Sequence, residues 1–273
     1  MPKKSLGQHF LTDRSVVRRI VEAIGREPVI IEVGPGPGVL TGPLAAAGGT
    51  LVCVELDDDL AARLQEHFAS TPSVTVVHAD VLASPAAALL AAGGVAAGTP
   101  YVVAGNLPYN IGAAILRHFL EAEHPPQRMV VMLQREVARS ICAPPGDLGL
   151  LGVATQAYAM PRHLFDVPPG AFAPPPKVTS SVIELTRHET PIVTPADRDA
   201  FFTTVRAGFS APRKQLRNTL AQGLRIEPSV AEAVLASAGI ETSLRPALLS
   251  VEDWLRLSRA VSTVIANLPK IPA

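Results

Sequence analysis

The chain has 273 residues, and its 24 lysines and arginines balance 24 aspartates and glutamates, so the formal net charge is zero. Zero net charge excludes attraction of an acidic partner by the field of the whole chain, so any basic surface must be local. Apolar residues make up 48% of the sequence and aromatic residues 4%, which predicts a globular core filled mainly by aliphatic side chains.

Cysteine usage and the apolar stretches exclude further classes of protein. Cys53 and Cys142 lie far apart without the spacing of metal ligands, which predicts reduced thiols and no metal site. The first residues include lysines but no apolar segment of the kind that secretory signals contain. The alanine-rich stretch 86–98 is too short and too interrupted by glycine to span a bilayer. We expect a monomeric, cytoplasmic protein without membrane contact.

Short apolar runs alternate with helical patterns up to residue 187. Five runs are nearly continuous in Val, Ile and Leu, as strands buried on both faces are. They cover residues 29–34, 50–56, 74–80, 101–106 and 129–134. The segment 57–69 predicts a helix with Leu60, Leu64 and Phe68 on one face. This alternation predicts an α/β fold with a parallel, doubly wound sheet.

The pattern changes in the last part of the chain. Residues 162–167 and 178–187 predict a late pair of strands, for which an antiparallel arrangement is one option. From about residue 188 onward, strand patterns stop and helical segments open with Thr, Ser or Pro. These predicted helices cover 194–209, 228–239 and 250–268, with Trp254 in their core. We therefore expect an α/β domain over 1–188 and a small helical domain over 189–273.

A glycine-rich turn follows the first predicted strand, in the sequence VIIEVGPGPGVLTGPLA. Glycines at 34, 36 and 38 let the backbone pass close to a ligand where a Cβ atom would clash. A dinucleotide fingerprint requires a glycine at the position of Val39, and the prolines at 35 and 37 stiffen the turn. A diphosphate cradle is therefore disfavoured, and an ordinary tight turn is the other interpretation.

Acidic residues end the next two predicted strands. Glu55 closes the second strand, where a carboxylate can accept hydrogen bonds from both hydroxyls of a ribose. Asp80 closes the third strand, where a carboxylate can reach the amino group of an adenine. A ribose and an adenine without a diphosphate indicate S-adenosyl-L-methionine rather than NAD. The alternative is that both carboxylates are purely structural.

The fourth strand ends in AGNLPYNIG, residues 104–112, and this turn suits the amine of a nucleobase. Such an amine is a poor nucleophile because its lone pair is delocalised into the ring. The side-chain oxygen of Asn106 and the backbone carbonyl of Leu107 can accept its two N–H bonds, while Pro108 restricts the residue before it. Tyr109 offers a face on which the base can stack. An ordinary proline turn with a buried tyrosine is the alternative.

These motifs closely resemble the bacterial small-subunit (16S) ribosomal RNA adenine N6-dimethyltransferases, and the resemblance covers nearly the whole chain. The segments that carry it are KKSLGQHFLTD (3–13), EVGPGPGVLT (32–41), VELD (54–57), HADVL (78–82), AGNLPYNI (104–111), MLQREVA (132–138), FAPPPKVTSSVI (172–183), RKQLRN (213–218) and RPALLSVEDWLRL (245–257). The resemblance implies a Rossmann-like class I methyltransferase sheet followed by a small helical domain.

The resemblance also implies roles for individual residues. Contacts with S-adenosyl-L-methionine are implied for His9, Leu11, Gly34, Glu55, Asp80 and Asn106. The target adenine is expected between Tyr109 and Phe172, the aromatic residue of FAPPPKV. The chain departs from the family at His9, where Asn is frequent, and at Gly112, where Ser is frequent. His9 could therefore contact the cofactor through its backbone or through an imidazole nitrogen.

Basic residues gather where the helical domain begins. Residues 206–225 carry five basic residues and no acidic one. A helix would present Arg213, Lys214 and Arg217 together, and phosphate contacts from them would position an RNA. Further basic residues near the N-terminus are Lys3, Lys4, Arg14, Arg18 and Arg19. The alternative for the run 206–225 is a solvated face without a partner.

We therefore expect transfer of methyl groups to the N6 amines of two adjacent adenosines in 16S ribosomal RNA, within an immature small ribosomal subunit. The target adenine must leave its stack to reach the methyl donor. Two other interpretations stay open. One is another amino-methyltransferase, acting on DNA, large-subunit ribosomal RNA or a glutamine amide. The other is a ribosome-assembly factor that acts mainly by binding.

Overall fold

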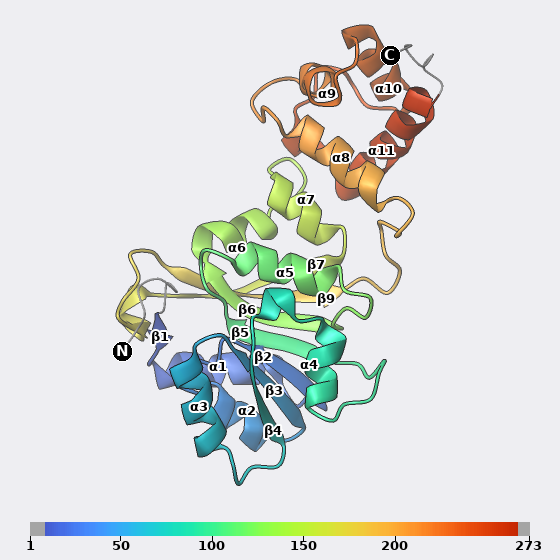
Figure 1. Ribbon diagram of the computed structural model, residues 1–273. Coiled ribbons are helices and arrows are strands. Elements are labelled where there is room, and N and C mark those ends of the chain that lie inside the picture. The colour runs from blue at the N-terminus through green and yellow to red at the C-terminus, as the bar shows by residue number, and fades with distance from the viewer. Residues whose placement is uncertain (1–8, 267–273) are drawn as a thin grey trace. The chain divides into compact units, whose positions relative to one another are not determined.

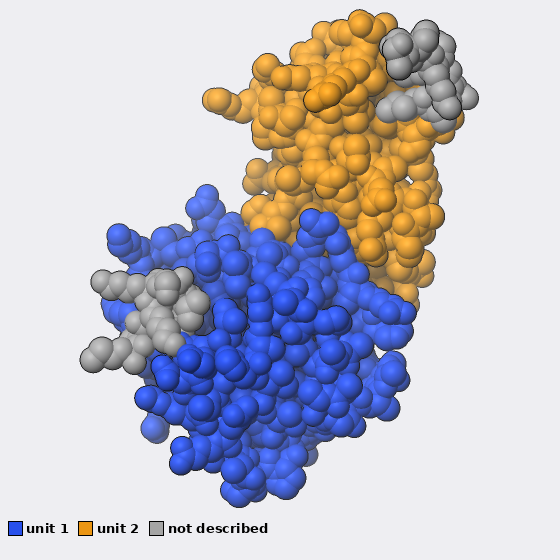
Figure 2. All heavy atoms as spheres, viewed as in Figure 1, with its two compact units in different colours: residues 1–139, 160–187 blue, residues 140–159, 188–273 orange. Residues whose placement is uncertain are grey.

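The computed structural model describes residues 9–266, which fall into two compact units (Figures 1 and 2). The first unit comprises Met1–Arg139 and Met160–Arg187, and the second comprises Ser140–Ala159 and His188–Ala273. Among the described residues, no helix is both long enough and apolar enough to cross a membrane. The predicted residues Lys3 and Lys4 lie outside the described part of the chain.

A seven-stranded sheet is the framework of the first unit, with the strand order β4-β3-β2-β5-β6-β9-β7. In chain order the strands are β2 (Val29–Val33), β3 (Thr50–Glu55), β4 (Val74–His78), β5 (Val102–Asn106), β6 (Arg128–Gln134), β7 (Ala159–Val167) and β9 (Ser180–Arg187). Strands β4, β3, β2, β5 and β6 are paired in parallel, whereas β9 is antiparallel to β6. The predicted parallel sheet with two late strands is confirmed.

Helices flank this sheet (Figure 1). They are α1 (Arg14–Ile24), α2 (Thr41–Ala47), α3 (Asp58–His67), α4 (Ala86–Ala92), α5 (Gly112–Leu120) and α6 (Arg135–Ile141), with short 3-10 turns η2 (Val81–Ala83) and η3 (Pro169–Ala171). Side chains cap two of the helices, because Asp13 accepts from the first amides of α1 and Asp57 from those of α3. A separate two-stranded sheet pairs β1 (Phe10–Leu11) with β8 (Phe172–Ala173) in antiparallel fashion.

The second unit is helical and is packed around Trp254, which is fully buried. Its helices are α7 (Leu150–Gln156), α8 (Arg198–Gly208), α9 (Leu216–Leu224), α10 (Pro228–Ser237) and α11 (Val251–Ala266), with a 3-10 turn η4 (Pro246–Leu248). Gly208 lets α8 approach α11, since a Cβ atom there would lie 2.3 Å from Cη2 of Trp254. The core position predicted for Trp254 is confirmed.

Residues 140–159 belong to the helical unit, whereas the sequence placed everything before 188 in the first domain. Leu148 and Val153 are buried in the same core as Trp254. The rings of Tyr158 and Phe202 stack with centroids 6.1 Å apart. The chain thus enters the helical unit, returns to the sheet for β7 and β9, and enters the helical unit again. A single domain boundary predicted from the sequence cannot describe units that are each made of two separate segments of the chain.

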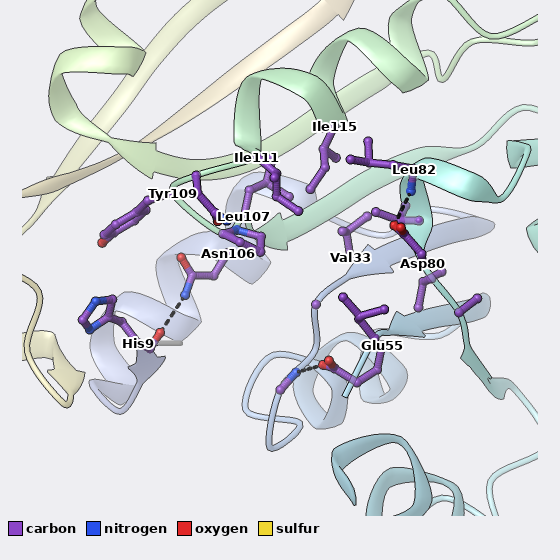
Figure 3. Close-up of a pocket in the computed structure, with 18 of the residues that line it drawn as sticks. His9, Val33, Glu55, Asp80, Leu82, Asn106, Leu107, Tyr109, Ile111 and Ile115 are labelled. Atoms are coloured by element: carbon purple, nitrogen blue, oxygen red, sulfur yellow. Dashed lines mark hydrogen bonds between the residues drawn. The ribbon is translucent and has the colours of Figure 1, made fainter. Parts of the chain in front are cut away.

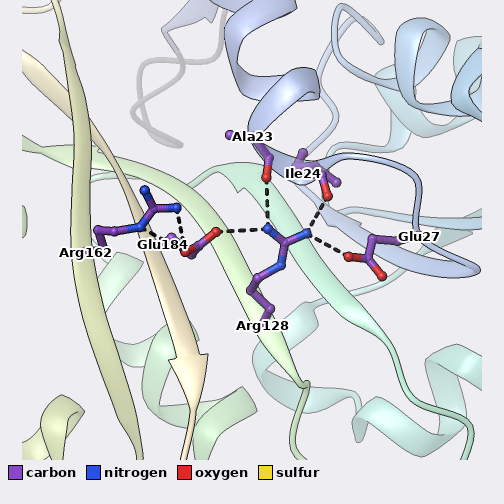
Figure 4. A network of polar contacts seen from close by, with 6 residues as sticks. All are labelled: Ala23, Ile24, Glu27, Arg128, Arg162 and Glu184. Atoms are coloured by element: carbon purple, nitrogen blue, oxygen red, sulfur yellow. Dashed lines mark hydrogen bonds and ion pairs between the residues drawn. The ribbon is translucent and has the colours of Figure 1, made fainter.

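Arg128, the first residue of β6, ties helix α1 to the sheet (Figure 4). Its Nη1 atom donates to the carbonyl oxygen of Ala23 and to Oε2 of Glu184, each at 2.9 Å. Its Nη2 atom donates to the carbonyl oxygen of Ile24 and to Oε1 of Glu27, the latter at 2.7 Å. The last carbonyls of a helix have no partner inside the helix and carry partial negative charge, so the guanidinium satisfies and neutralises them.

A second arginine completes this network. Arg162 donates through Nη2 to Oε1 of Glu184 at 2.9 Å (Figure 4). Burial alone would raise the pKa of Glu184, but the hydrogen bonds from Arg162 and Arg128 hold that pKa below its ordinary value of 4.5. A lowered pKa means that the ionised form is favoured by folding, so this stabilisation is present above the ordinary pKa and is lost as the pH falls.

We expect the substitution Arg128→Met to lower the free energy of unfolding at pH 7 by about 2 kcal/mol, because it leaves Glu184 and the helix carbonyls without their donor. The loss of stability between pH 7 and pH 4 should also become smaller than in the wild type. Urea unfolding at both pH values measures the two effects. Arg117→Met is the control, since the ion pair of Arg117 with Glu121 is largely exposed on the arginine side and should contribute under about 0.5 kcal/mol. Equal losses in both variants would contradict the assignment.

Candidate functional site

A cavity of about 340 Å³ lies at the carboxyl ends of strands β2, β3, β4 and β5 (Figure 3). This is the edge of a parallel sheet where ligands bind in open α/β folds, and the volume suits a small-molecule ligand. The residues that line it are His9, Phe10, Val33, Gly34, Gly36, Val54, Glu55, Leu56, Ala79, Asp80, Val81, Leu82, Asn106, Leu107, Pro108, Tyr109, Asn110, Ile111 and Ile115. Figure 3 shows Glu55 and Asp80 toward one end, and Asn106, Tyr109 and His9 toward the other.

The glycine-rich turn after β2 forms one wall of the cavity. Gly34, Gly36 and Gly38 have φ values of 62°, 58° and 86°, in the left-handed region where a side chain is strained. At Gly36 a Cβ atom would also lie 3.1 Å from the ring of Phe10. The turn therefore requires glycine for its conformation and for its contact with Phe10.

Glu55 ends β3 and faces the same turn. The backbone N–H of Gly36 donates to its Oε2 atom at 3.0 Å, and the N–H of Asp57 donates to its Oε1 atom at 2.9 Å. The side chain is 6% exposed. Each carboxylate oxygen thus has one backbone donor that holds it in place, and each keeps a further lone pair for a ligand.

A second carboxyl group lies buried behind the glycine-rich turn. Glu32 in β2 is 1% exposed, and the Sγ atom of Cys53 donates to its Oε2 atom at 3.5 Å. Burial raises the pKa of Glu32 to about 7. Glu32 does not line the cavity, so it supports the strand below the turn rather than presenting a charge to a ligand.

Asp80 follows the last residue of β4 by two positions and is the N-terminal capping residue of η2. Its Oδ1 atom accepts from the N–H of Leu82 at 2.9 Å, and the residue is exposed at the cavity wall. This bond fixes the direction of the carboxylate and uses one of its two oxygen atoms. An ordered carboxylate at this position can accept a hydrogen bond from an amine in the cavity.

Asn106, the last residue of β5, presents an unusual acceptor. Its Nδ2 atom donates to the carbonyl oxygen of His9 at 3.0 Å. Its Oδ1 atom is buried and has no hydrogen-bond partner among the described residues. Burying a carbonyl oxygen without a donor costs about 1–3 kcal/mol. The site therefore holds a free acceptor in a fixed direction.

Tyr109 is half-buried and is held at both its hydroxyl and its ring. Its hydroxyl lies 2.6 Å from Oγ of Ser180, and the ring of His9 stacks on it with centroids 5.7 Å apart and planes inclined by 26°. The Nδ1 atom of His9 lies 2.8 Å from the carbonyl oxygen of Pro174. A carbonyl can only accept, so Nδ1 of His9 carries a proton. Ser180 and Pro174 lie in the segment FAPPPKVTSSVI, far from Tyr109 in sequence, and nothing in that segment by itself predicts these two contacts.

Most of the predicted pocket residues lie together, and two lie elsewhere. His9, Gly34, Glu55, Asp80 and the Asn106–Tyr109 turn all line the cavity. Leu11 and Phe172 do not line it: each is 4% exposed, and they are paired with each other between β1 and β8. In this arrangement the ring that faces Tyr109 is His9 and not Phe172. The role of Phe172 in holding the adenine stays a prediction.

The structure corrects the prediction that one helix carries the three basic residues. Helix α9 begins at Leu216, after Arg213 and Lys214, which lie in an exposed turn. The turn is closed by the bond from the N–H of Lys214 to the carbonyl oxygen of Ala211. The N–H of Leu216 is bonded to the carbonyl oxygen of Leu244, at 2.7 Å, so the chain here is fixed by another loop and not by an earlier helical turn.

Arg217 is the only one of the three on α9, and it is half-buried. Its Nη1 atom forms an ion pair with Oε1 of Glu232 at 2.7 Å. The run 206–225 itself contains no acidic residue, but Glu232 comes from α10, beyond the run. Of these three residues, Arg213 and Lys214 are therefore the two with exposed charge.

Solved structures establish the class of protein. The crystal structure of the 23S rRNA methyltransferase ErmE has a TM-score of 0.70 and 28% sequence identity, covering 93% of this chain and 99% of that one. A dimethyladenosine transferase from Plasmodium falciparum has a TM-score of 0.78 over 94% of this chain and 98% of that one, and at 19% identity it indicates the fold alone. The fold and the strand-end cavity are those of a Rossmann-like class I methyltransferase.

Sequence comparisons identify the family. The family model of ribosomal RNA adenine dimethylase matches residues 2–262. A protein of Dehalococcoides mccartyi named "Ribosomal RNA small subunit methyltransferase A" is 42% identical over 257 residues, 93% of this chain and 87% of that protein. A protein of the same name from Xanthomonas campestris pv. campestris is 44% identical over 260 residues, 94% of this chain and 95% of that protein. The chain belongs to the ribosomal RNA adenine dimethylase family and is an enzyme, as its sequence predicted.

The strands that carry the two halves of the cavity approach closely at Gly105. A Cβ atom on Gly105 would lie 2.4 Å from the backbone carbonyl oxygen of Val33 in β2. At Gly112 a Cβ atom would lie 2.6 Å from Cδ2 of Leu133, which is the end of a flexible side chain. The first contact cannot be relieved without moving a strand, whereas the second can be relieved by a change of rotamer.

We expect Gly105→Ala to lower the free energy of unfolding by at least about 3 kcal/mol, because two central strands must separate. Gly112→Ser, which introduces the residue frequent in the family, should cost less than about 1.5 kcal/mol. Denaturant unfolding of both variants compares them directly. Equal destabilisation would mean that the contact with Val33 does not set the spacing of β2 and β5.

Proposed function

We propose that the protein transfers methyl groups from S-adenosyl-L-methionine to the N6 amines of two adjacent adenosines in small-subunit (16S) ribosomal RNA. The observation that carries this proposal is the buried Oδ1 atom of Asn106, an acceptor without a donor at the wall of the cavity. Family membership supports the reaction, and relatives at 42% and 44% identity are named for the small subunit. The 28% identical ErmE structure makes large-subunit RNA the competing substrate.

The cavity wall suits S-adenosyl-L-methionine at the end formed by Gly34, Glu55 and Asp80. Backbone N–H groups hold both oxygens of Glu55, which supports the proposal that it accepts from two ribose hydroxyls. In the same proposal, Asp80 accepts from the adenine amine. Bound there, S-adenosyl-L-methionine supplies the methyl group. The role of Leu11 in cofactor contact would run through its backbone, because its side chain is buried away from the cavity.

The other end of the cavity suits the acceptor adenine. Asn106 Oδ1 and the carbonyl of Leu107 accept the two N–H bonds of the amine and favour a pyramidal nitrogen whose lone pair faces the methyl group. Positive charge that develops on that nitrogen is stabilised by the same oxygens, so positioning and preorganised dipoles provide most of the catalysis. The bond between Asn106 Nδ2 and the carbonyl of His9 keeps Oδ1 turned toward the amine.

Stacking of the adenine on Tyr109 requires a rearrangement at His9. The imidazole ring now occupies one face of Tyr109 and is anchored to Pro174. Phe172 is 4% exposed and lies in β8, which is paired with β1, so exposing its ring to the same base requires this two-stranded sheet to rearrange. We propose that both changes accompany binding of the unstacked adenine. Contact with an immature small subunit, and action as a monomer in the cytoplasm, are parts of the same proposal.

Methyl transfer from isotopically labelled S-adenosyl-L-methionine tests the function. Purified protein is incubated with small subunits, large subunits or DNA, each lacking the relevant methylation. The label should enter small subunits alone, at the N6 positions of two adjacent adenosines. Label in large subunits or DNA, with none in small subunits, would contradict the proposed substrate. Binding to small subunits without any transfer would favour an assembly role.

Asn106→Ala should reduce the single-turnover rate at saturating S-adenosyl-L-methionine by about 10²-fold, as expected when a preorganised polar group in an active site is lost. Removing Oδ1 should not by itself lower the stability of the fold, because this buried oxygen has no hydrogen-bond donor to lose. Rapid-quench measurement of methyl transfer gives the rate, and thermal unfolding gives the stability. A near-normal rate would refute the acceptor role of Asn106.

Arg213 and Lys214 should contact RNA phosphates, since both are exposed in a turn. Changing both to Gln should lower the slope of log affinity against log salt by roughly 1.5, because each contact contributes about 0.7–0.9. Arg217→Gln is the matched comparison and should change the slope less, because Arg217 is paired with Glu232. A salt titration of binding to small subunits measures both. Unchanged slopes in the double variant would leave this run as a solvated face.

A further inference from the structure

A histidine outside the cavity joins two of its walls. His118 lies in α5, and its Nε2 atom is 3.0 Å from the carbonyl oxygen of Ser84. Because a carbonyl can only accept, Nε2 of His118 must be the donor. Ser84 directly follows η2 as its C-terminal capping residue, and Asp80 caps the other end of this short turn. Neither His118 nor Ser84 belongs to the motifs by which the sequence resembles its family.

The bond from His118 leads to Asp80 through one residue. The Oγ atom of Ser84 donates to the backbone carbonyl oxygen of Asp80 at 2.8 Å. The N–H of Leu82 donates in turn to Oδ1 of Asp80 at 2.9 Å. These bonds close the segment 80–84 on itself, so that a displacement of Ser84 displaces the carboxylate of Asp80. Among these bonds, only the one from His118 joins the segment 80–84 to an α-helix.

Helix α5 is a firm support for this contact. Ile115, one turn before His118, is fully buried and lines the cavity, and Phe119 beside it is also fully buried. The ring of His118 is edge-on to the ring of Phe119, with centroids 5.3 Å apart. Helix α5 also follows directly on the turn that carries Asn106 and Tyr109. His118 thus links the wall that holds Asp80 to the wall that holds the acceptor amide.

We infer that His118 is a positioning residue for the methyl donor: its bond to Ser84 sets Asp80 for the adenine amine of S-adenosyl-L-methionine. This inference rests on the proposed function, because it assigns the partner of Asp80 from it. His118 does not line the cavity, so its effect must pass through the segment 80–84. Loss of the bond therefore weakens donor binding and leaves the acceptor oxygen of Asn106 in place.

The test compares two substitutions of similar length, His118→Met and His118→Gln, in the full-length protein. Met cannot donate, whereas the side-chain amide of Gln can donate to the carbonyl of Ser84. The dissociation constant of S-adenosyl-L-methionine, measured by calorimetry, should rise about three- to tenfold in His118→Met, the effect of one hydrogen bond. His118→Gln should stay within about twofold of the wild type. The turnover number at saturating donor should be nearly unchanged in both, which separates positioning from a loss of fold.

Double-mutant cycles decide whether the effect passes through Asp80. In an Asp80→Ala background, His118→Met should cause no further loss of donor affinity, because residues that act through one contact are not additive. In a Glu55→Gln background the full three- to tenfold effect should persist. His124→Leu, at an exposed histidine after α5, is the control and should bind the donor as the wild type does.

The outcomes separate the inference from the function on which it rests. A wild-type protein that binds no S-adenosyl-L-methionine would overturn the proposed function itself. Wild-type affinity in His118→Met, or an unchanged effect of His118→Met in the Asp80→Ala background, would overturn the positioning role alone. If His118→Met does not fold, the Gln variant decides: a tenfold loss of donor affinity in a folded His118→Gln protein would refute the role of the Nε2 donor.

Discussion

The close approach of β2 and β5 is the constraint on which the site depends. Without a side chain at Gly105, the backbone of β5 lies against the carbonyl of Val33, and the parallel pairing of Ile31 with Val103 sets the register. Strand β5 therefore ends, at Asn106, beside the turn that begins at Gly34. A bulkier residue at 105 would move the acceptor amide away from the glycine-rich turn, and the two halves of the cavity would no longer face each other.

The cavity contains two carboxylates that accept hydrogen bonds from the protein and one amide oxygen that accepts none. Glu55 and Asp80 are held by backbone N–H groups, which fixes their direction before a ligand arrives. Asn106 instead keeps a buried oxygen without a donor, at a cost to stability of about 1–3 kcal/mol. That cost is sustained because the surrounding contacts over-determine the amide: the carbonyl of His9 accepts from Nδ2, and the residue ends a central strand. An unsatisfied acceptor in a fixed direction is the expected mark of a site prepared for a donor.

His9 connects several parts of the first unit in the described structure. Its carbonyl binds Asn106, its ring stacks on Tyr109 and its Nδ1 atom binds the carbonyl of Pro174. The sequence resemblance had placed His9 among cofactor contacts, and its position in the cavity wall is compatible with that. The structure adds a second consequence: the ring covers a face of Tyr109 that an adenine would use. Under the proposed function, binding of both substrates would therefore involve the short segment around His9.

Sequence alone determined the parallel sheet, the order of its strands along the chain and the strand-end residues Glu55, Asp80 and Asn106. These follow from local patterns, because runs of Val, Ile and Leu predict buried strands, and parallel strands bring their carboxyl ends to one edge. Tertiary structure alone decided which ring faces Tyr109, why Gly105 is required, that Glu232 pairs with Arg217, and that residues 140–159 join the helical unit. Each of these depends on contacts between segments far apart in sequence, whose distances and directions no local pattern encodes.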